Sequence, residues 1–202
     1  MGCLIGKKAV DFTTSAVLED GSIKKDFNLY NHIENKNALL FFYPMDFTFV
    51  CPSELIALNN RLEEFEKRDI KIITISCDSH FVHRAWRNTP LESGGIGNEI
   101  KYVMVSDMKK TIMTSYGVED VASGTAYRGS LIIDKNKIIR VMHVHDFPIG
   151  RNIDEYIRIF DALFFHNKHG NVCQAGWVNG DDGINPSLDG ISKFLSSKSK
   201  KL

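Results

Sequence analysis

The chain of 202 residues lacks an excess of either charge, because 25 lysines and arginines are matched by 25 aspartates and glutamates. A protein that binds nucleic acid or an anionic membrane surface through its net charge carries a basic excess, so this balance argues against both partners. The chain also lacks a long apolar run: the longest, residues 38–43, is far shorter than the ~20 residues that span a bilayer. We therefore expect neither nucleic acid nor membrane as a partner.

Cysteine and proline are scarce as well, with four and five residues. The cysteines, Cys3, Cys51, Cys77 and Cys173, are too few and too scattered for the disulfide framework of a secreted domain. The first residues lack the apolar segment of a secretory signal. A cytoplasmic location, where thiols stay reduced, is the resulting expectation.

What the sequence does contain is a series of short apolar runs separated by helical patterns, which is typical of an α/β layer architecture. The expected strands are residues 38–43, 70–76, 102–105, 130–133 and 138–145. The last two are separated by a turn and predict a hairpin. Apolar residues at helical spacing predict one helix from Pro52 to Phe65 and a second that starts at Asn152, with Glu155 in a capping-box position.

The composition changes after about residue 167, where Gly, Asn, Asp and Ser dominate. We expect one domain over residues 6–166, followed by an extended C-terminal arm over residues 167–202. A few apolar residues in this arm need a surface to cover: Val172, Trp177, Ile184, Leu188 and Phe194.

The segment Phe41–Glu54 leads from a buried strand into a helix and presents Cys51 at the start of that helix. Pro52 suits the first helical position because its missing N–H would be unpaired there anyway, which predicts Cys51 as the N-cap. Free backbone N–H groups and the helix dipole favour a thiolate at such a position. Thr48 is expected to hold its hydroxyl beside the sulfur, and Pro44 to stiffen the turn. An inert buried cysteine is the alternative that position alone leaves open.

This segment resembles the active-site segment of the typical two-cysteine peroxiredoxins, since Thr48, Cys51 and Pro52 match the pattern P-x-x-x-T-x-x-C-P. Further motifs of that family are matched in the same order along the chain by residues 79–86, 127–134, 146–151 and 172–177. The resemblance extends from about Gly6 to Pro186. It implies a thioredoxin-like fold, with α/β/α layers around a central mixed sheet. It also implies an obligate homodimer that often assembles into a decamer.

For the chemistry, the resemblance implies peroxide reduction without a metal, haem or flavin cofactor. Cys51 would be the peroxidatic cysteine, which attacks hydrogen peroxide or an alkyl hydroperoxide and becomes a sulfenic acid. Arg128 would favour the thiolate and, with Thr48, polarise the peroxide. Pro44 would shield the sulfenic acid from water.

Three further residues receive roles from the same resemblance. Glu54 and Arg151 are expected to orient Arg128. Cys173 would be the resolving cysteine, which forms the intersubunit disulfide Cys51–Cys173 that thioredoxin then reduces. Because Cα atoms more than about 7 Å apart cannot be bridged without backbone movement, we expect the helix at Cys51 to unwind locally during turnover.

Two segments bear on inactivation by excess peroxide. Residues 94–97, Gly-Gly-Ile-Gly, closely resemble a loop of the peroxide-sensitive members of the family, whereas Phe194 and Leu195 stand where those members have Tyr-Phe. A C-terminal helix that packs less firmly would let Cys173 react sooner. We therefore expect intermediate sensitivity.

Other interpretations of the sequence compete with that of a peroxidase. Cys77, His80 and His83 have metal-like spacing, but a structural zinc site normally needs four ligands, so we expect no metal and histidines that decorate a helix surface. A cysteine hydrolase would need a histidine as general base, and the papain-like surroundings of its cysteine are absent. An oligomeric holdase chaperone could coexist with the peroxidase. The chain has no C-x-x-C motif, which disfavours a thioredoxin-type oxidoreductase.

Overall fold

The computed structural model describes residues 2–201, and the chain divides into two compact units, one ending at Ile153 and one beginning at Asp154. Each unit is described by itself. The domain boundary expected near residue 167 falls inside the long helix α6 (Ile153–His169). The last residue of the expected arm, Leu202, lies outside the described residues.

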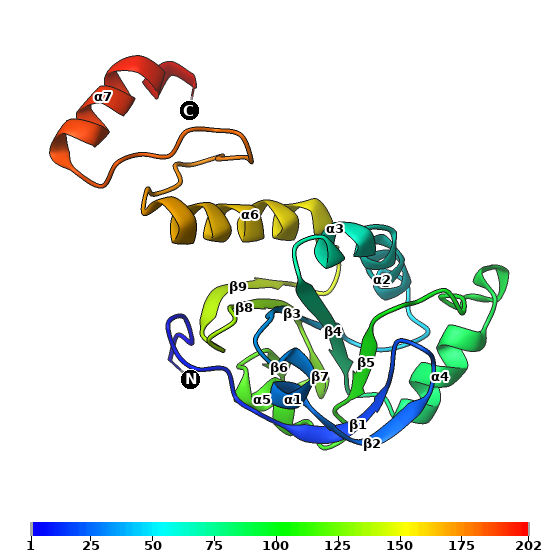
Figure 1. Ribbon diagram of the computed structural model, residues 1–202. Helices are drawn as coiled ribbons and strands as arrows, with labels where there is room; N and C mark the ends of the chain where they lie inside the picture. Colours follow the sequence, from blue (N-terminus) through cyan, green and yellow to red (C-terminus); the bar gives the residue numbers. More distant parts are fainter. Residues whose placement is uncertain (1, 202) are drawn as a thin grey trace. The chain divides into compact units, whose positions relative to one another are not determined.

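The first unit is built on a seven-stranded sheet with the strand order β2-β1-β5-β4-β3-β8-β9, which can be followed in Figure 1 from the blue hairpin to β9. The strands are β1 (Thr13–Val17), β2 (Ile23–Asn28), β3 (Asn37–Phe42), β4 (Ile70–Ser76), β5 (Val103–Ser106), β8 (Arg128–Ile133) and β9 (Ile139–His145). Strands β3, β4 and β5 are mutually parallel, and the other neighbours pair antiparallel. The expected mixed sheet and all five expected strands are confirmed, whereas the hairpin β1–β2 was not predicted.

The helices of the first unit are α1 (Leu29–Ile33), α2 (Cys51–Asn60), α3 (Leu62–Glu66), α4 (His80–Asn88) and α5 (Thr111–Ser115), with a short 3-10 turn η1 (Leu91–Ser93). A two-stranded sheet, β6 (Glu119–Asp120) with β7 (Thr125–Ala126), completes the unit. The single helix expected over residues 52–65 is interrupted at Arg61, where the backbone leaves the helical region (φ −108°, ψ 4°). The expected N-cap is also wrong: Cys51 is the first helical residue and Val50 holds the cap position.

Strand β3 is buried on both faces, which explains its continuous apolar run. Because side chains alternate along a strand, Ala38, Leu40 and Phe42 join the core cluster that also contains residues of α1 and α5. Phe41 points to the opposite face. In the register of β3 with β8, Phe41 pairs with Ser130, so the end of β3 lies beside the start of β8.

The second unit consists of α6, α7 (Leu188–Lys198), the turn η2 (Ser199–Lys201) and the segment that joins α6 to α7. Trp177 is its anchor: the indole is buried, lies 5.1 Å from the Phe165 ring, and its backbone carbonyl accepts a hydrogen bond from Arg158 Nη1 (2.8 Å). The segment expected as an arm contains α7, which agrees with the C-terminal helix that the family resemblance implies. Leu188, expected to cover a surface, is 90% exposed. Helix α6 begins one residue later than the expected Asn152.

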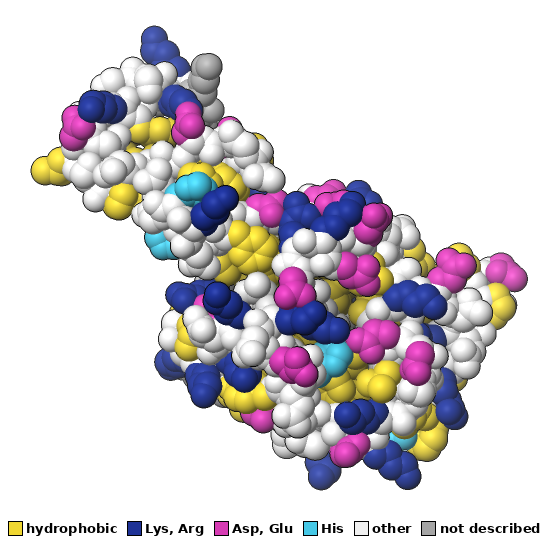
Figure 2. Space-filling view, in the orientation of Figure 1, with side chains coloured by type: hydrophobic (Ala, Val, Ile, Leu, Met, Phe, Trp, Pro, Cys, Tyr) yellow, Lys and Arg dark blue, Asp and Glu magenta, His cyan; other side chains and the backbone are white. Residues whose placement is uncertain are grey.

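The surface carries charges of both signs. On the face shown in Figure 2, basic and acidic side chains are interspersed, as the equal totals of 25 predict. None of the helices in the described residues combines the length and the hydropathy that a membrane span requires.

Candidate active site

Cys51 lies where β3 ends, after an eight-residue connection over residues 43–50, as the first residue of α2. It is fully buried. Among the described residues no side chain caps the start of α2, and Pro52 has no N–H of its own. The N-terminal turn of the helix therefore directs its positive end at the position of the thiol.

Arg128, the first residue of β8, is the positively charged partner of this thiol. Its Nη1 donates to Cys51 Sγ at 3.4 Å and to Glu54 Oε2 at 2.9 Å, and its Nε donates to the Phe147 carbonyl at 2.7 Å. These three hydrogen bonds, made by Nη1 and Nε, fix the orientation of the planar guanidinium. Sequence analysis placed Arg128 here only through the resemblance, since 77 residues separate it from Cys51.

Glu54 and Arg151 hold Arg128 in place. Glu54 Oε1 accepts from the backbone N–H and from Nε of Arg151, each at 2.9 Å, and Oε2 accepts from Arg151 Nη2 at 3.0 Å. Burial raises the pKa of Glu54, but the hydrogen bonds and charge of Arg151, with the charge of Arg128, outweigh burial and bring the pKa below its usual value. Glu54 is therefore a carboxylate that two guanidinium groups share.

Arg151 is itself anchored in the sheet. Its Nη1 donates to the Gly129 carbonyl at 2.9 Å and to Ser130 Oγ at 2.8 Å, and its guanidinium carbon lies 3.2 Å from the centre of the Phe41 ring. Since Arg151 takes most of the acceptor capacity of Glu54, the charge of Arg128 is only partly balanced by that carboxylate. Negative charge on Cys51 Sγ would complete the balance.

A pocket of about 520 Å³ lies over Cys51. Its apolar lining consists of Pro44, Met45, Phe49, Val50, Cys51, Phe147 and Pro148, and its polar lining of Thr48, Ser123, Thr125 and Arg128. Pro44 and Thr48 thus lie in the same pocket as Cys51, as expected. The Thr48 hydroxyl donates to the Met45 carbonyl at 2.8 Å, so in this structure it is engaged by the loop.

Comparisons with known proteins agree with this geometry. The sequence profile of the AhpC/TSA family matches residues 5–142. The chain belongs to this family.

Close relatives cover almost the whole chain. It is 49% identical to alkyl hydroperoxide reductase C of Buchnera aphidicola subsp. Baizongia pistaciae, over 98% of this chain and 99% of that protein. It is 46% identical to peroxiredoxin-1 of Gallus gallus, over 96% of each chain. The crystal structure of reduced Plasmodium vivax 2-Cys peroxiredoxin is similar, with a TM-score of 0.93, 42% identity, and coverage of 97% of this chain and 100% of that one. The resemblance to the peroxiredoxins and the thioredoxin-like fold are thus confirmed, and the protein is a thiol peroxidase.

The second unit of this AhpC/TSA-family chain holds Cys173. Its thiol is half-buried and donates to the Ala162 carbonyl at 3.5 Å. Burial raises the pKa of Cys173, and the charge of Arg158 opposes that rise only in part. Cys173 therefore lacks the concentrated positive charge that surrounds Cys51.

The metal-like spacing of Cys77, His80 and His83 has a different meaning in the structure. His83 does not decorate the helix surface, as the sequence suggested, but is fully buried, with Nδ1 2.7 Å from Asp46 Oδ2 and Nε2 3.1 Å from the Val105 carbonyl. Both ring nitrogens are thus occupied by the protein. Within the described residues, no group of three His, Cys, Asp or Glu side chains is arranged to hold a metal ion.

The Gly-Gly-Ile-Gly segment forms a compact turn after α4. Gly94 and Gly97 have φ values of +78° and +75°, and a Cβ at Gly95 would lie 1.8 Å from the Thr89 carbonyl oxygen. Trp86 Nε1 donates to the Gly94 carbonyl at 2.9 Å. All three glycines are required by this backbone.

Sequence analysis missed two parts of the site. The Phe147 carbonyl, which fixes Arg128, is a backbone group and left no side-chain signal beyond the motif at residues 146–151. The buried contact between Asp46 and His83 was missed because His83 lies on a helix with polar neighbours. The spacing of Tyr43 and Asp46 within the active-site segment was the signal that could have indicated it.

Proposed function

We propose that Cys51 is the peroxidatic cysteine and that it reduces hydrogen peroxide and alkyl hydroperoxides. The observation that carries this proposal is the contact of Arg128 Nη1 with Cys51 Sγ at the base of an apolar pocket. A guanidinium there favours the thiolate before reaction and stabilises negative charge on the leaving oxygen during it. The apolar lining suits the carbon chain of an organic hydroperoxide.

The reaction requires no cofactor. The Cys51 thiolate attacks the terminal oxygen of the hydroperoxide, so that an S–O bond forms while the O–O bond breaks. The sulfur is oxidised by two electrons. The peroxide proton passes to the leaving oxygen, which departs as alcohol or water and leaves a sulfenate. Pro44 and Thr48 line the same pocket. Pro44 would exclude water, and the Thr48 hydroxyl would turn from the Met45 carbonyl to donate a hydrogen bond to the peroxide.

Cys173 is the resolving cysteine in this proposal. Its thiol condenses with the Cys51 sulfenic acid of the partner subunit, which forms the S–S bond of Cys51–Cys173 and releases water. Thioredoxin then reduces the disulfide and is itself oxidised. Because Cys51 is fully buried at the head of α2, the disulfide requires the first turn of α2 and the preceding loop to move.

The proposal includes a homodimer, assembled further into a decamer, in the cytoplasm. An intersubunit disulfide needs the dimer, and a cytoplasmic location fits four cysteines that are too few and too scattered for the disulfide framework of a secreted domain. The arm over residues 167–202 would be the segment that carries Cys173 to the partner. A cysteine hydrolase is disfavoured because, within the described residues, no histidine lines the pocket of Cys51.

The test is non-reducing gel electrophoresis after one equivalent of hydrogen peroxide. The wild type is expected to form a covalent dimer, and Cys51→Ser and Cys173→Ser to form none. Cys77→Ser is the matched control, since this thiol is also partly buried and its pKa is raised by burial. A covalent dimer in Cys173→Ser, or its loss in Cys77→Ser, would contradict the assignment. Peroxide consumption with and without thioredoxin then identifies the reductant.

A further inference from the structure

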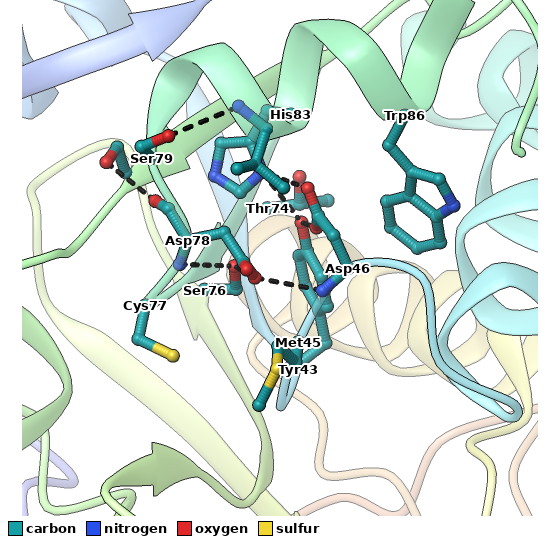
Figure 3. Close-up of polar contacts among 12 residues, drawn as sticks. Tyr43, Met45, Asp46, Thr74, Ser76, Cys77, Asp78, Ser79, His83 and Trp86 are labelled. Carbon is teal, nitrogen blue, oxygen red and sulfur yellow. Dashed lines mark hydrogen bonds and ion pairs between the residues drawn. The ribbon is translucent and has the colours of Figure 1, made fainter. Parts of the chain in front are cut away.

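A buried polar cluster lies on the loop that connects β3 to α2, and Figure 3 shows its members. At its centre is the Asp46 carboxylate: the Tyr43 hydroxyl donates to Oδ1 at 2.7 Å, and His83 Nδ1 lies 2.7 Å from Oδ2. The side chains of Asp46 and His83 have no exposed surface. Burial of an acid and a base is costly unless both are fully hydrogen-bonded, so such a pair constrains the backbone that carries it.

The hydrogen bonds of His83 define the protons of this pair. Because the Val105 carbonyl can only accept, Nε2 of His83 carries a proton. One further proton then lies between Nδ1 and Asp46 Oδ2, and on either atom it leaves the pair neutral overall. Burial raises the pKa of Asp46, and the hydrogen bond to His83 opposes that rise. The pair is thus complete in its bonds without any solvent contact.

A second tie holds the same residue by its backbone. The Asp46 N–H donates to Asp78 Oδ2 at 2.9 Å, and Ser76 Oγ donates to that oxygen at 2.7 Å. Asp78 follows the end of β4, whereas His83 lies on α4. Asp46 is therefore tied to two different elements, by its side chain to one and by its backbone to the other.

The loop that these ties hold is strained. Phe47, the next residue, has a φ of +53°, which is unfavourable for a bulky side chain. Its ring lies 5.8 Å from that of Trp86 on α4. The ties precede the strained residue directly, and Thr48 and Cys51 follow it. A loop in this conformation relaxes when its ties are broken.

We propose that Asp46, Asp78 and His83 form a latch on the loop before α2, and that the opening of this latch limits how fast Cys51 becomes accessible for resolution. The three are positioning residues, because none of them lines the Cys51 pocket. The part that concerns resolution rests on the proposed function, whereas the hold on the loop does not.

The rate at which the latch opens decides between two fates of the Cys51 sulfenic acid. In one, the resolving thiol attacks sulfur, the disulfide forms and water leaves. In the other, a second hydroperoxide oxidises the sulfur by two more electrons to a sulfinic acid and is itself reduced to alcohol or water. A latch that opens more often favours the first fate, since the covered sulfur is out of reach of a second cysteine.

Asp46→Asn and Asp46→Ala form a matched pair of variants. In Asp46→Asn the amide oxygen still accepts from Tyr43. The amide N–H donates to Nδ1 of a neutral His83, whose Nε2–H still donates to the Val105 carbonyl. The latch is therefore kept. In Asp46→Ala both side-chain bonds are lost. Because asparagine also keeps the volume of aspartate, Asp46→Leu is the control for packing: leucine fills a similar volume at this buried site without either hydrogen bond, and this variant is expected to behave like Asp46→Ala.

Amide hydrogen exchange of residues 44–53 in the reduced protein measures the latch directly. We expect exchange to be at least about tenfold faster in Asp46→Ala and close to wild type in Asp46→Asn, as the loss of buried charge-assisted hydrogen bonds predicts. Exchange of residues 128–133 in β8 is the control for folding. Equal exchange in the alanine and asparagine variants, or no increase in either, would overturn the latch.

The redox readout is the fraction of Cys51 converted to sulfinic acid per turnover, measured by mass spectrometry. It is expected to fall several-fold in Asp46→Ala and to stay near wild type in Asp46→Asn.

Asp78→Ala breaks the backbone tie without altering Asp46, and it is expected to change exchange and sulfinic acid formation in the same direction as Asp46→Ala. Unchanged exchange in this variant would overturn the two-tie arrangement. Sulfenate on Cys51 in a Cys173→Ser background separates the two proposals: without it the proposed function fails, whatever the exchange result.

Discussion

The two cysteines of the proposed cycle lie in opposite kinds of surroundings. Cys51 is fully buried at the head of a helix, with the Arg128 guanidinium at 3.4 Å. Cys173 is half-buried in the second unit, donates to a backbone carbonyl, and has its pKa raised by burial. Positive charge is thus arranged around the Cys51 thiol, whereas the Cys173 thiol resembles that of an ordinary buried cysteine.

The difference follows from what each sulfur must do. The attacking sulfur has to break an O–O bond, so it needs negative charge on itself and positive charge for the leaving oxygen. The second sulfur attacks an already oxidised partner, and its reaction is limited by access. Buried charge is expensive, which explains why Arg128 shares one carboxylate with Arg151 in a rigid cluster and why Cys173 has no such cluster.

Replacement of Arg128 should reduce the difference in reactivity between Cys51 and Cys173 more than any other change discussed below. In Arg128→Met, the second-order rate constant of Cys51 with hydrogen peroxide is expected to fall by about 10²–10³-fold, the usual effect of removing a preorganised electrostatic contact. Arg128→Lys should be intermediate, because an ammonium cannot meet Cys51, Glu54 and the Phe147 carbonyl together. Stopped-flow fluorescence measures the rate.

Arg140→Met is the matched control for this prediction. Arg140 also forms a 2.7 Å ion pair with a carboxylate, that of Asp134, but it is part-exposed on β9. Its rate constant should equal that of wild type. A similar loss in both variants would mean that general charge, rather than the contact with Cys51, governs reactivity.

Glu54→Gln should mainly reduce stability. It removes the carboxylate that two buried guanidinium groups share, and breaking such a buried pair costs about 3–5 kcal/mol. The free energy of unfolding in urea measures this loss. Glu64→Gln is the control, because Glu64 pairs with Lys67 and Arg68 at the surface, where solvent screens the ion pairs and little change in stability is expected.

The pKa of Glu54 gives the sign of the pH dependence. Because its folded pKa lies below the unfolded value, its contribution is fully present above the unfolded pKa and is lost as the pH falls through the folded one. Acid titration should therefore show a steeper loss of stability in the wild type than in Glu54→Gln, because the variant lacks the part of the slope that Glu54 contributes. Parallel curves for the two proteins would contradict the role of Glu54 as a buried carboxylate.

The sequence predicted those parts of the fold in which burial leaves a pattern. Strand β3 reads as a continuous apolar run because it is buried on both faces, and β4 was recognised from its four isoleucines, which are all buried. Strand β2 was missed because its run Ile-Lys-Lys-Asp-Phe-Asn is largely exposed and does not alternate, so its pairing with β1 comes from tertiary context. The C-terminal helix α7 was expected only through the family resemblance, because none of its described residues is buried and its pattern indicates no core face.

The candidate site likewise contains parts that could be predicted from the sequence and parts that could not. The position of Cys51 at a helix start could be predicted locally, because Pro52 marks the first turn. The contact with Arg128 could not be derived from residue types, since it depends on the pairing of β3 with β8. His83 was read as a surface residue, because nothing in a single sequence reveals that the loop at Asp46 meets α4 in the interior.

The rate of alkylation of Cys173 measures how the reactivity of the second thiol differs from that of Cys51. Since burial raises its pKa, Cys173 should react with iodoacetamide more slowly than a free thiol at neutral pH, and the rate should rise as the pH increases through the raised pKa. Arg158→Met removes the charge that opposes this rise, so a further decrease of a few-fold is expected. Mass spectrometry of the alkylated peptide gives the rate for Cys173 alone.

Glu155→Gln is the control for that experiment, because it removes the ion-pair partner of Arg158 and keeps the positive charge. Its alkylation rate should stay at or above the wild-type value. A decrease equal to that in Arg158→Met would show that packing of α6, rather than charge, sets the reactivity of Cys173.

The C-terminal helix should produce the smallest effect, on inactivation by excess peroxide. Leu195 is 45% exposed and α7 has no buried residue, so little apolar area anchors this helix. The double variant Phe194→Tyr/Leu195→Phe should anchor it more firmly, delay Cys173, and raise the fraction of Cys51 sulfinic acid per turnover by a few-fold. Lys193→Arg, at an exposed position of the same helix, should leave that fraction unchanged. If the double variant and the wild type lose activity at the same peroxide concentration, access of Cys173 is set by the loop before α2 and not by α7.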